Sequence, residues 1–218
     1  MLVRSADETS TAGALKYLVP QTKKVPQMKG FETPPVSPEA AAWVQKHLEG
    51  WPKISIAVAS DLITKYGLPK ESNDRELTWY ENGPWKRTVL HRDEVKHNFP
   101  LPHADVLEQT VNYRVPLDKV ADLLKYDGSL LIDRTRGELT VHCDNEQANT
   151  LTLNIANDIV TGDRNVDQAL AYHAQVVRGV QIGEHETYPY KLRFKVPQAV
   201  ADTADPAQEA ELLKHLGE

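Results

Sequence analysis

The chain has 218 residues, of which 40% are hydrophobic and 26% charged, and its formal net charge is -6. This length can bury one core of ordinary size, and the composition is that of a globular protein. The acidic balance argues against a broad nucleic-acid-binding face, which needs clustered lysine and arginine. No run of 18 apolar residues occurs, so we predict no transmembrane helix.

The cysteine content bears on the compartment. Cys143 is the single cysteine, so no disulfide within the chain supports the fold, and a reducing compartment is favoured. The first residues lack the apolar segment of a signal peptide. We therefore predict a cytoplasmic protein, with export as the alternative if a signal segment precedes this sequence.

Composition divides the chain into three parts. Residues 1–36 contain four prolines among many polar residues, which predicts an extended or partly disordered arm. This arm is also where a second copy of the chain could dock to form a homo-oligomer. Residues 37–197 are predicted to form a single α+β domain. Residues 198–218 are predicted to be a polar tail with a surface helix near 207–216.

Two helices are predicted at the start of the domain. Ser37 suits a helix N-cap, Pro38 suits the first helical position, and Gly50 suits the end of that helix. Residues 54–66 have apolar residues at helical spacing and are followed by Gly67, which stops the second helix.

The middle of the chain is predicted to contain two hairpins, a strand and a helix. The dipeptide Asn82-Gly83 tolerates the positive backbone angles of a tight turn. The elements expected there, in chain order, are strands 76–80 and 85–92, a loop over 93–105, an alternating strand over 107–115, a helix over 118–126, and strands 130–134 and 139–143.

Two more helices and a late strand complete the prediction. Capping-box spacing predicts the two helix starts, at Asp144 with Gln147 and at Asn165 with Gln168. Residues 190–196 alternate like a strand, with 180–182 as the candidate partner strand. Hairpins beside helices indicate an α+β fold, with an antiparallel or mixed sheet of two hairpins plus further strands, packed with four to six helices.

Histidines are concentrated between the first hairpin and the alternating strand. His91, His97 and His103 are spaced six residues apart, and Asp105 follows. Imidazole and carboxylate are zinc ligands, so His97, His103 and Asp105 are candidate metal ligands, with His91 or His142 joining from a neighbouring strand. The spacing matches no recognised metal motif, and the alternative is that these are hydrogen-bonded packing residues.

Aromatic and cationic side chains surround the first hairpin turn. Trp79, Tyr80 and Trp85 beside Arg87 are candidates for stacking on a ligand. The favoured alternative is a cross-strand pair of Trp79 and Trp85 that covers the sheet.

Two further arginines lie on or beside the predicted strands. Arg114 and Arg134 are candidates for an anion-binding cluster, although cross-strand ion pairs are the favoured alternative. His142 and Cys143 are neighbours on a strand, so their side chains should face opposite sides and not pair.

The chain contains none of the common nucleotide-binding or hydrolase motifs: no Walker loop, no GxGxxG, no GxSxG and no HExxH. We therefore expect a non-enzymatic binding or interaction domain that needs no cofactor and recognises a protein or a small molecule. The alternative is a metal-dependent hydrolase that uses the region from His91 to Asp105. In it a divalent ion such as zinc lowers the pKa of a bound water.

Overall fold

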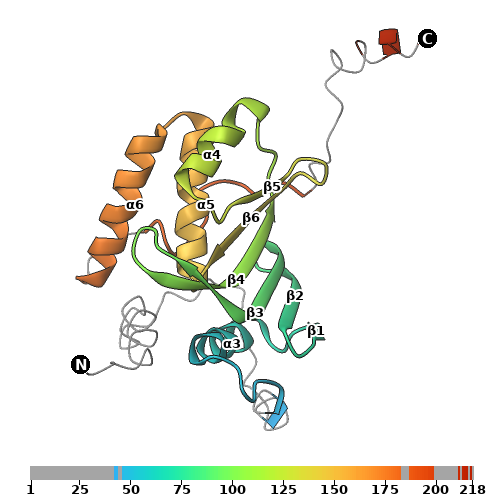
Figure 1. The fold of residues 1–218 in the computed structure, drawn as a ribbon, viewed down its shortest axis with the longest axis vertical. Helices are drawn as coiled ribbons and strands as arrows, with labels where there is room; N and C mark the ends of the chain where they lie inside the picture. Colours follow the sequence, from blue (N-terminus) through green and yellow to red (C-terminus); the bar gives the residue numbers. More distant parts are fainter. Residues whose placement is uncertain are drawn as a thin grey trace, which may run out of the picture.

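The computed structural model describes residues 42–43, 46–182, 187–198, 211, 213–215 and 217. Strands and helices alternate in blocks along the described chain (Figure 1). The elements and their bounds are α3 Lys53–Tyr66, β1 Glu71–Ser72, β2 Glu76–Asn82, β3 Trp85–His97, β4 His103–Asn112, the short 3-10 helix η1 Leu117–Lys119, α4 Val120–Tyr126, β5 Leu131–Asp133, β6 Glu138–Cys143, α5 Glu146–Thr161 and α6 Val166–Gln181.

The strands form one six-stranded sheet in the order β1-β2-β3-β4-β6-β5, and all neighbouring strands are antiparallel. The predicted α+β class with a sheet built on two hairpins is confirmed. In Figure 1, α4, α5 and α6 form a layer beside β4 and β6, and α3 lies near β2 and β3. The described helices lack the length and apolarity needed to span a bilayer.

Alternation along β4 directs one side of the strand to the helices. Leu107, Gln109 and Val111 are completely buried on that side. Asn149 of α5 donates hydrogen bonds to the Leu107 carbonyl and to the Gln109 side chain, at 3.1 and 3.0 Å. The neighbouring residues, which include Glu108, face the opposite side of the strand. We call that side the open face of the sheet.

Both tryptophans of the first hairpin belong to the core. Trp79 is 2% exposed and donates from its indole N–H to the Gly67 carbonyl, and Trp85 is 1% exposed. They do not form the expected cross-strand pair, because Trp79 lies opposite Thr88 in the register. Their burial also removes them as surfaces for stacking a ligand. Apolar packing decides their position, as it does for most large aromatic side chains.

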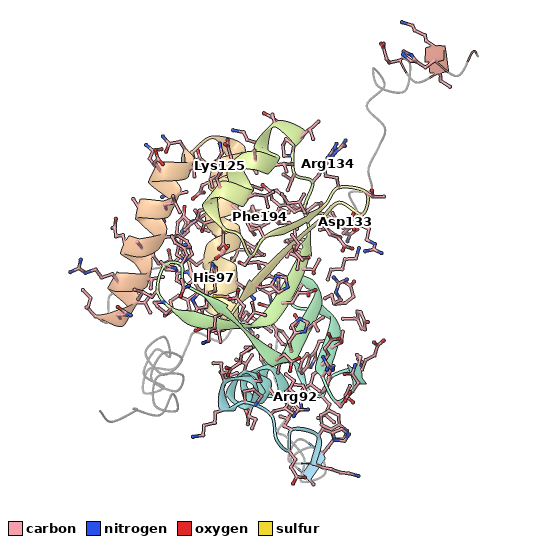
Figure 2. All side chains as sticks on the ribbon, in the orientation of Figure 1. Arg92, His97, Lys125, Asp133, Arg134 and Phe194 are labelled. Carbon is pink, nitrogen blue, oxygen red and sulfur yellow. The ribbon has the colours of Figure 1, made fainter. Side chains whose placement is uncertain are left out.

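The predicted loop over 93–105 is wrong in extent, because β3 continues to His97 and β4 begins at His103. Their pairing shifts between Leu90 and Val95, where β3 carries extra residues. Such a bulge bends the strand and changes the direction of its side chains. The long hairpin therefore has a far arm beyond the bulge, and His97 lies on this arm (Figure 2).

The predicted strand over 190–196 is also wrong, since that segment is irregular and residues 180 and 181 belong to α6. The side chain of Asn154 donates to the carbonyls of Tyr188 and Lys191 and accepts from the amide of Arg193. One buried amide thus satisfies backbone groups that a neighbouring strand would otherwise pair.

The helix caps were predicted with partial success. The capping box of Asn165 and Gln168 is present at the start of α6, as expected. Helix α5, however, is capped by Asn145, whose side chain accepts from the Ala148 amide, and not by Asp144. The arm over 1–36 and the start of the first predicted helix lie outside the described residues. In the tail, residues 211 and 213–215 are helical.

Candidate functional site

The far arm of the β3–β4 hairpin brings two histidines and an aspartate together. His97 lies opposite His103 in the strand register, and Asp105 follows two residues later on the same side of β4. One ligand atom from each of these three residues lies within 4.8 Å of the other two. We call this group the hairpin cluster.

The contacts within the hairpin cluster are short. His103 Nε2 is 3.0 Å from Asp105 Oδ1, and His97 Nδ1 is 3.3 Å from Asp105 Oδ2. Neither contact has the alignment of a hydrogen bond: within the described residues, His97 Nδ1 and Asp105 Oδ1 are buried without a hydrogen-bond partner. Unsatisfied buried polar atoms are costly and uncommon, and a bound water or ion is one of the standard explanations for them.

The outer nitrogen of His103 has an orienting hydrogen-bond partner, whereas that of His97 faces a more distant carboxylate. His103 Nδ1 is 2.8 Å from the carbonyl oxygen of Leu101, so this nitrogen donates and Nε2 faces Asp105. His97 Nε2 is 3.9 Å from a carboxylate oxygen of Asp127. In metal sites the second ring nitrogen of a ligating histidine usually donates to a carbonyl or a carboxylate, and His103 follows this pattern.

Burial raises the free energy of the charged carboxylates around the hairpin cluster. Asp105, Asp127 and Asp144 are between 4% and 9% exposed. Burial raises the pKa of both Asp127 and Asp144. For Asp105 burial acts in the same direction, but the contacts with His103 and His97 hold its pKa below the ordinary value. Three buried carboxyl groups around two imidazoles favour a cation among them.

The pKa values of both imidazoles in the hairpin cluster are raised. The contact with Asp105 raises the pKa of His97. Burial by itself would lower the pKa of His103, but Asp105 and the Leu101 carbonyl raise it above the ordinary value. Both rings are thus held in a field that favours positive charge, whether a proton or a metal ion supplies it.

Cys143 adds a sulfur to this neighbourhood. Its Sγ is 3.4 Å from His103 Nε2, and its side chain is buried. Burial raises the pKa of the Cys143 thiol well above its ordinary value, which argues against a free nucleophile. As predicted, Cys143 does not pair with His142, which contacts Glu108 on the open face instead.

His91 and His142 do not join the hairpin cluster, although the sequence made them its candidate fourth ligands. The ligand atoms of both rings instead gather around Glu108, on the open face of the sheet. Sequence inspection missed Glu108. Its only signal was its place between buried neighbours on the alternating strand, and its contact with His142 depends on the β4–β6 register.

The remaining candidate binding residues are dispersed. Arg87 contacts Glu108 and Glu138 on the open face. Tyr80 is exposed and donates from its hydroxyl to Glu71. The other two are exposed: Arg134 lies in the turn between β5 and β6 beside Asp133 (Figure 2), and Arg114 follows β4.

Comparison of the chain with protein-family models, with curated proteins and with solved structures finds no match. The arrangement of side chains is therefore the basis for assigning a function. The hairpin cluster defines the class of site: a compact group of two imidazoles and one carboxylate, held by adjacent strands and surrounded by further acids.

Proposed function

We propose that this protein binds a divalent transition-metal ion, zinc being the first candidate, through His97, His103 and Asp105. The observation that carries the proposal is the convergence of three candidate ligand residues, two of which, His97 and Asp105, hold a buried polar atom without a hydrogen-bond partner in the described part of the chain. Two imidazoles and one carboxylate form a donor set that binds zinc and non-haem iron.

This donor set supports hydrolysis as a reaction class. A site with three protein ligands leaves a coordination position for water, and the metal lowers the pKa of that water toward neutrality. Asp127, with a carboxylate oxygen 3.9 Å from His97 Nε2, would add negative charge beside that ligand. The chain residues would thus hold the ion and fix its ligands, while the ion activates the water.

A second role for the ion is favoured by the burial of its ligands. Asp105 and the His103 side chain are only 9% and 5% exposed, which suits an ion that fixes the β3–β4 hairpin of a non-enzymatic binding domain. The two roles differ in whether the ion retains an exchangeable water. Water-proton relaxation of a variant that lacks His91 and His142, loaded with Mn²⁺, measures this at the hairpin cluster, and fast-exchanging water supports the hydrolase.

Metal content tests the proposal itself. We expect the protein expressed in zinc-supplemented medium to carry zinc, as measured by mass spectrometry of the purified protein. The double variant H97A/H103A, and separately Asp105→Asn, should lose zinc from the hairpin cluster. His215→Ala, an exposed histidine in the C-terminal tail, is the matched control. If H97A/H103A remains folded and holds as much zinc as the parent, the proposal is wrong.

A further inference from the structure

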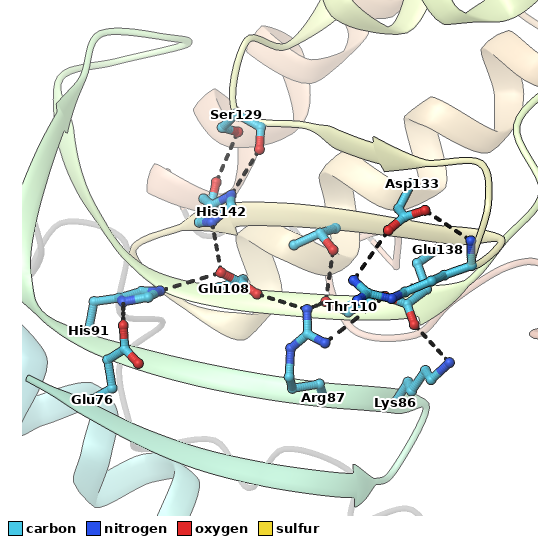
Figure 3. A network of polar contacts seen from close by, with 12 residues as sticks. Glu76, Lys86, Arg87, His91, Glu108, Thr110, Ser129, Asp133, Glu138 and His142 are labelled. Carbon is cyan, nitrogen blue, oxygen red and sulfur yellow. Dashed lines mark hydrogen bonds and ion pairs between the residues drawn. The ribbon is translucent and has the colours of Figure 1, made fainter. Parts of the chain in front are cut away.

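A second group of two histidines and a carboxylate lies on the open face of the sheet (Figure 3). His142 Nε2 is 3.2 Å and His91 Nε2 is 3.5 Å from the same oxygen of Glu108, Oε2. The three ligand atoms lie within 4.8 Å of one another. We call this group the sheet-face cluster. It shares no ligand residue with the hairpin cluster.

Each imidazole of the sheet-face cluster is oriented through its other nitrogen. His142 Nδ1 is 3.0 Å from the carbonyl oxygen of Ser129, which accepts only, so this nitrogen carries the proton. His91 Nδ1 is 3.3 Å from a carboxylate oxygen of Glu76. With both Nδ1 atoms facing acceptors, the Nε2 atoms of both rings are directed toward Glu108. This is the orientation that ligating histidines adopt in metal sites.

Three neighbouring strands hold the sheet-face cluster in place. His91 is on β3, Glu108 on β4 and His142 on β6, and Glu108 lies directly opposite His142 in the register. The other oxygen of Glu108 accepts from Arg87 at 3.3 Å, which fixes the carboxylate and leaves Oε2 for an ion. A site on paired strands is preorganised, because little chain entropy is lost when a ligand binds.

The side chains of the sheet-face cluster are more exposed to solvent than Asp105 and His103 of the hairpin cluster. The side chains of His91, His142 and Glu108 are 29%, 22% and 17% exposed. An ion at this position therefore keeps coordination positions that face solvent. Lys86 and Arg87 are balanced by Glu138 and Glu108, so the two cations do not leave the open face positively charged.

We propose that His91, Glu108 and His142 form a second divalent-metal site, on the opposite side of β4 and β6 from the hairpin cluster. The expected occupant is a borderline-soft ion such as Zn²⁺, which suits two imidazoles and one carboxylate. Water or a small anion fills the positions that face solvent.

Zinc titration of the chelator-stripped, full-length protein tests this site, with isothermal calorimetry giving the stoichiometry. We expect two equivalents for the parent chain and for the His215→Ala control. We expect one equivalent for H91A/H142A and one for H97A/H103A. A folded H91A/H142A variant that still binds two equivalents overturns the second site.

The outcomes separate this inference from the proposed function. One equivalent that survives in H91A/H142A but is lost in H97A/H103A refutes the sheet-face cluster and keeps the hairpin cluster. One equivalent with the reverse pattern refutes the hairpin cluster and keeps the sheet-face cluster. Glu76→Ala adds a finer test, because loss of an orienting partner should weaken zinc binding at the sheet-face cluster about 10–100-fold without changing the hairpin cluster.

A measurement on the parent chain covers the case in which a variant fails to fold. Long-range ¹H–¹⁵N correlation spectra report which ring nitrogen of each histidine carries a proton or a ligand. Saturation with zinc should shift the Nε2 resonances of His91 and His142, while their Nδ1 atoms stay protonated. Unchanged Nε2 resonances at zinc saturation would overturn the proposal without any substitution.

Discussion

Buried His173 should make the fold less stable in mild acid. The side chain lies within α6, is 4% exposed, and shares a 2.9 Å hydrogen bond between its Nδ1 and the hydroxyl of Tyr126. The ring of Phe99 packs edge-on against the His173 ring, with 5.1 Å between the two ring centroids. Burial, assisted by the nearby His103 and His97, lowers the pKa of His173 from 6.5 to about 3.

The sign and size of the effect follow from proton linkage. Because the folded pKa is depressed, the unfolded chain takes up a proton first as the pH falls through 6.5, and stability is lost between there and about pH 3. At pH 5.5 the unfolded state gains about 1.4 kcal/mol from protonating this one ring. Well above pH 6.5 the ring is neutral in both states, so protonation of His173 costs the folded protein no stability there.

Urea unfolding followed by tryptophan fluorescence measures the effect, since Trp79 and Trp85 are buried in the fold. His173→Asn retains a polar group beside Tyr126 but removes the titration. Between pH 7.5 and 5.5 the parent should lose about 1.4 kcal/mol more unfolding free energy than the variant. Taking the difference between the two proteins cancels the other titrating groups. Parallel pH profiles would show that His173 is not held neutral in the folded state.

Three further substitutions test the fold. Gly83→Ala should lower the unfolding free energy by ~1–3 kcal/mol, because Gly83 has φ +68 and an added Cβ would lie 3.2 Å from the Tyr66 hydroxyl. Thermal melts measure the loss. The control is Gly128→Ala, whose added Cβ meets nothing within 4 Å. Asn149→Ala removes two buried hydrogen bonds to β4 and should cost about 2–3 kcal/mol in urea unfolding, and a loss below ~0.5 kcal/mol would contradict this role. Asn165→Ala breaks the capping box of α6 and should cost about 1 kcal/mol, measured in the same way; an unchanged midpoint would show that the cap contributes little.

Local patterns predicted those elements whose structure depends on near neighbours. The alternating residues before Tyr113 form β4, and the spacing of Asn165 with Gln168 marks the start of α6. In both cases the signal lies within one strand or one helical turn. The same holds for the turn at Gly83, where Asn82 pairs with Trp85 across a two-residue loop.

Elements that depend on distant partners were mispredicted. The prolines and charged residues between His91 and Asp105 resemble a loop, yet both flanks are paired strands, because each flank supplies the other's hydrogen-bond partners. The alternation over 190–196 has the opposite outcome. Its apolar side chains pack on the core, but the buried side chain of Asn154 takes the place of a pairing strand.

The six-residue spacing of the histidines gave no indication of how they divide between two clusters. The division follows from the bulge in β3: beyond it His97 lies opposite His103, whereas His91, where the bulge begins, contacts Glu108 on the open face. Adjacent residues of β6 face opposite sides of the sheet: His142 contacts Glu108 on the open face, and Cys143 contacts His103 of the hairpin cluster. A shift of β3 by one residue relative to β4 would reverse the facing of every side chain on the arm and would separate both sets of ligand atoms. Both proposed metal sites therefore depend on the register of this one hairpin, and a substitution that alters the bulge should weaken both together.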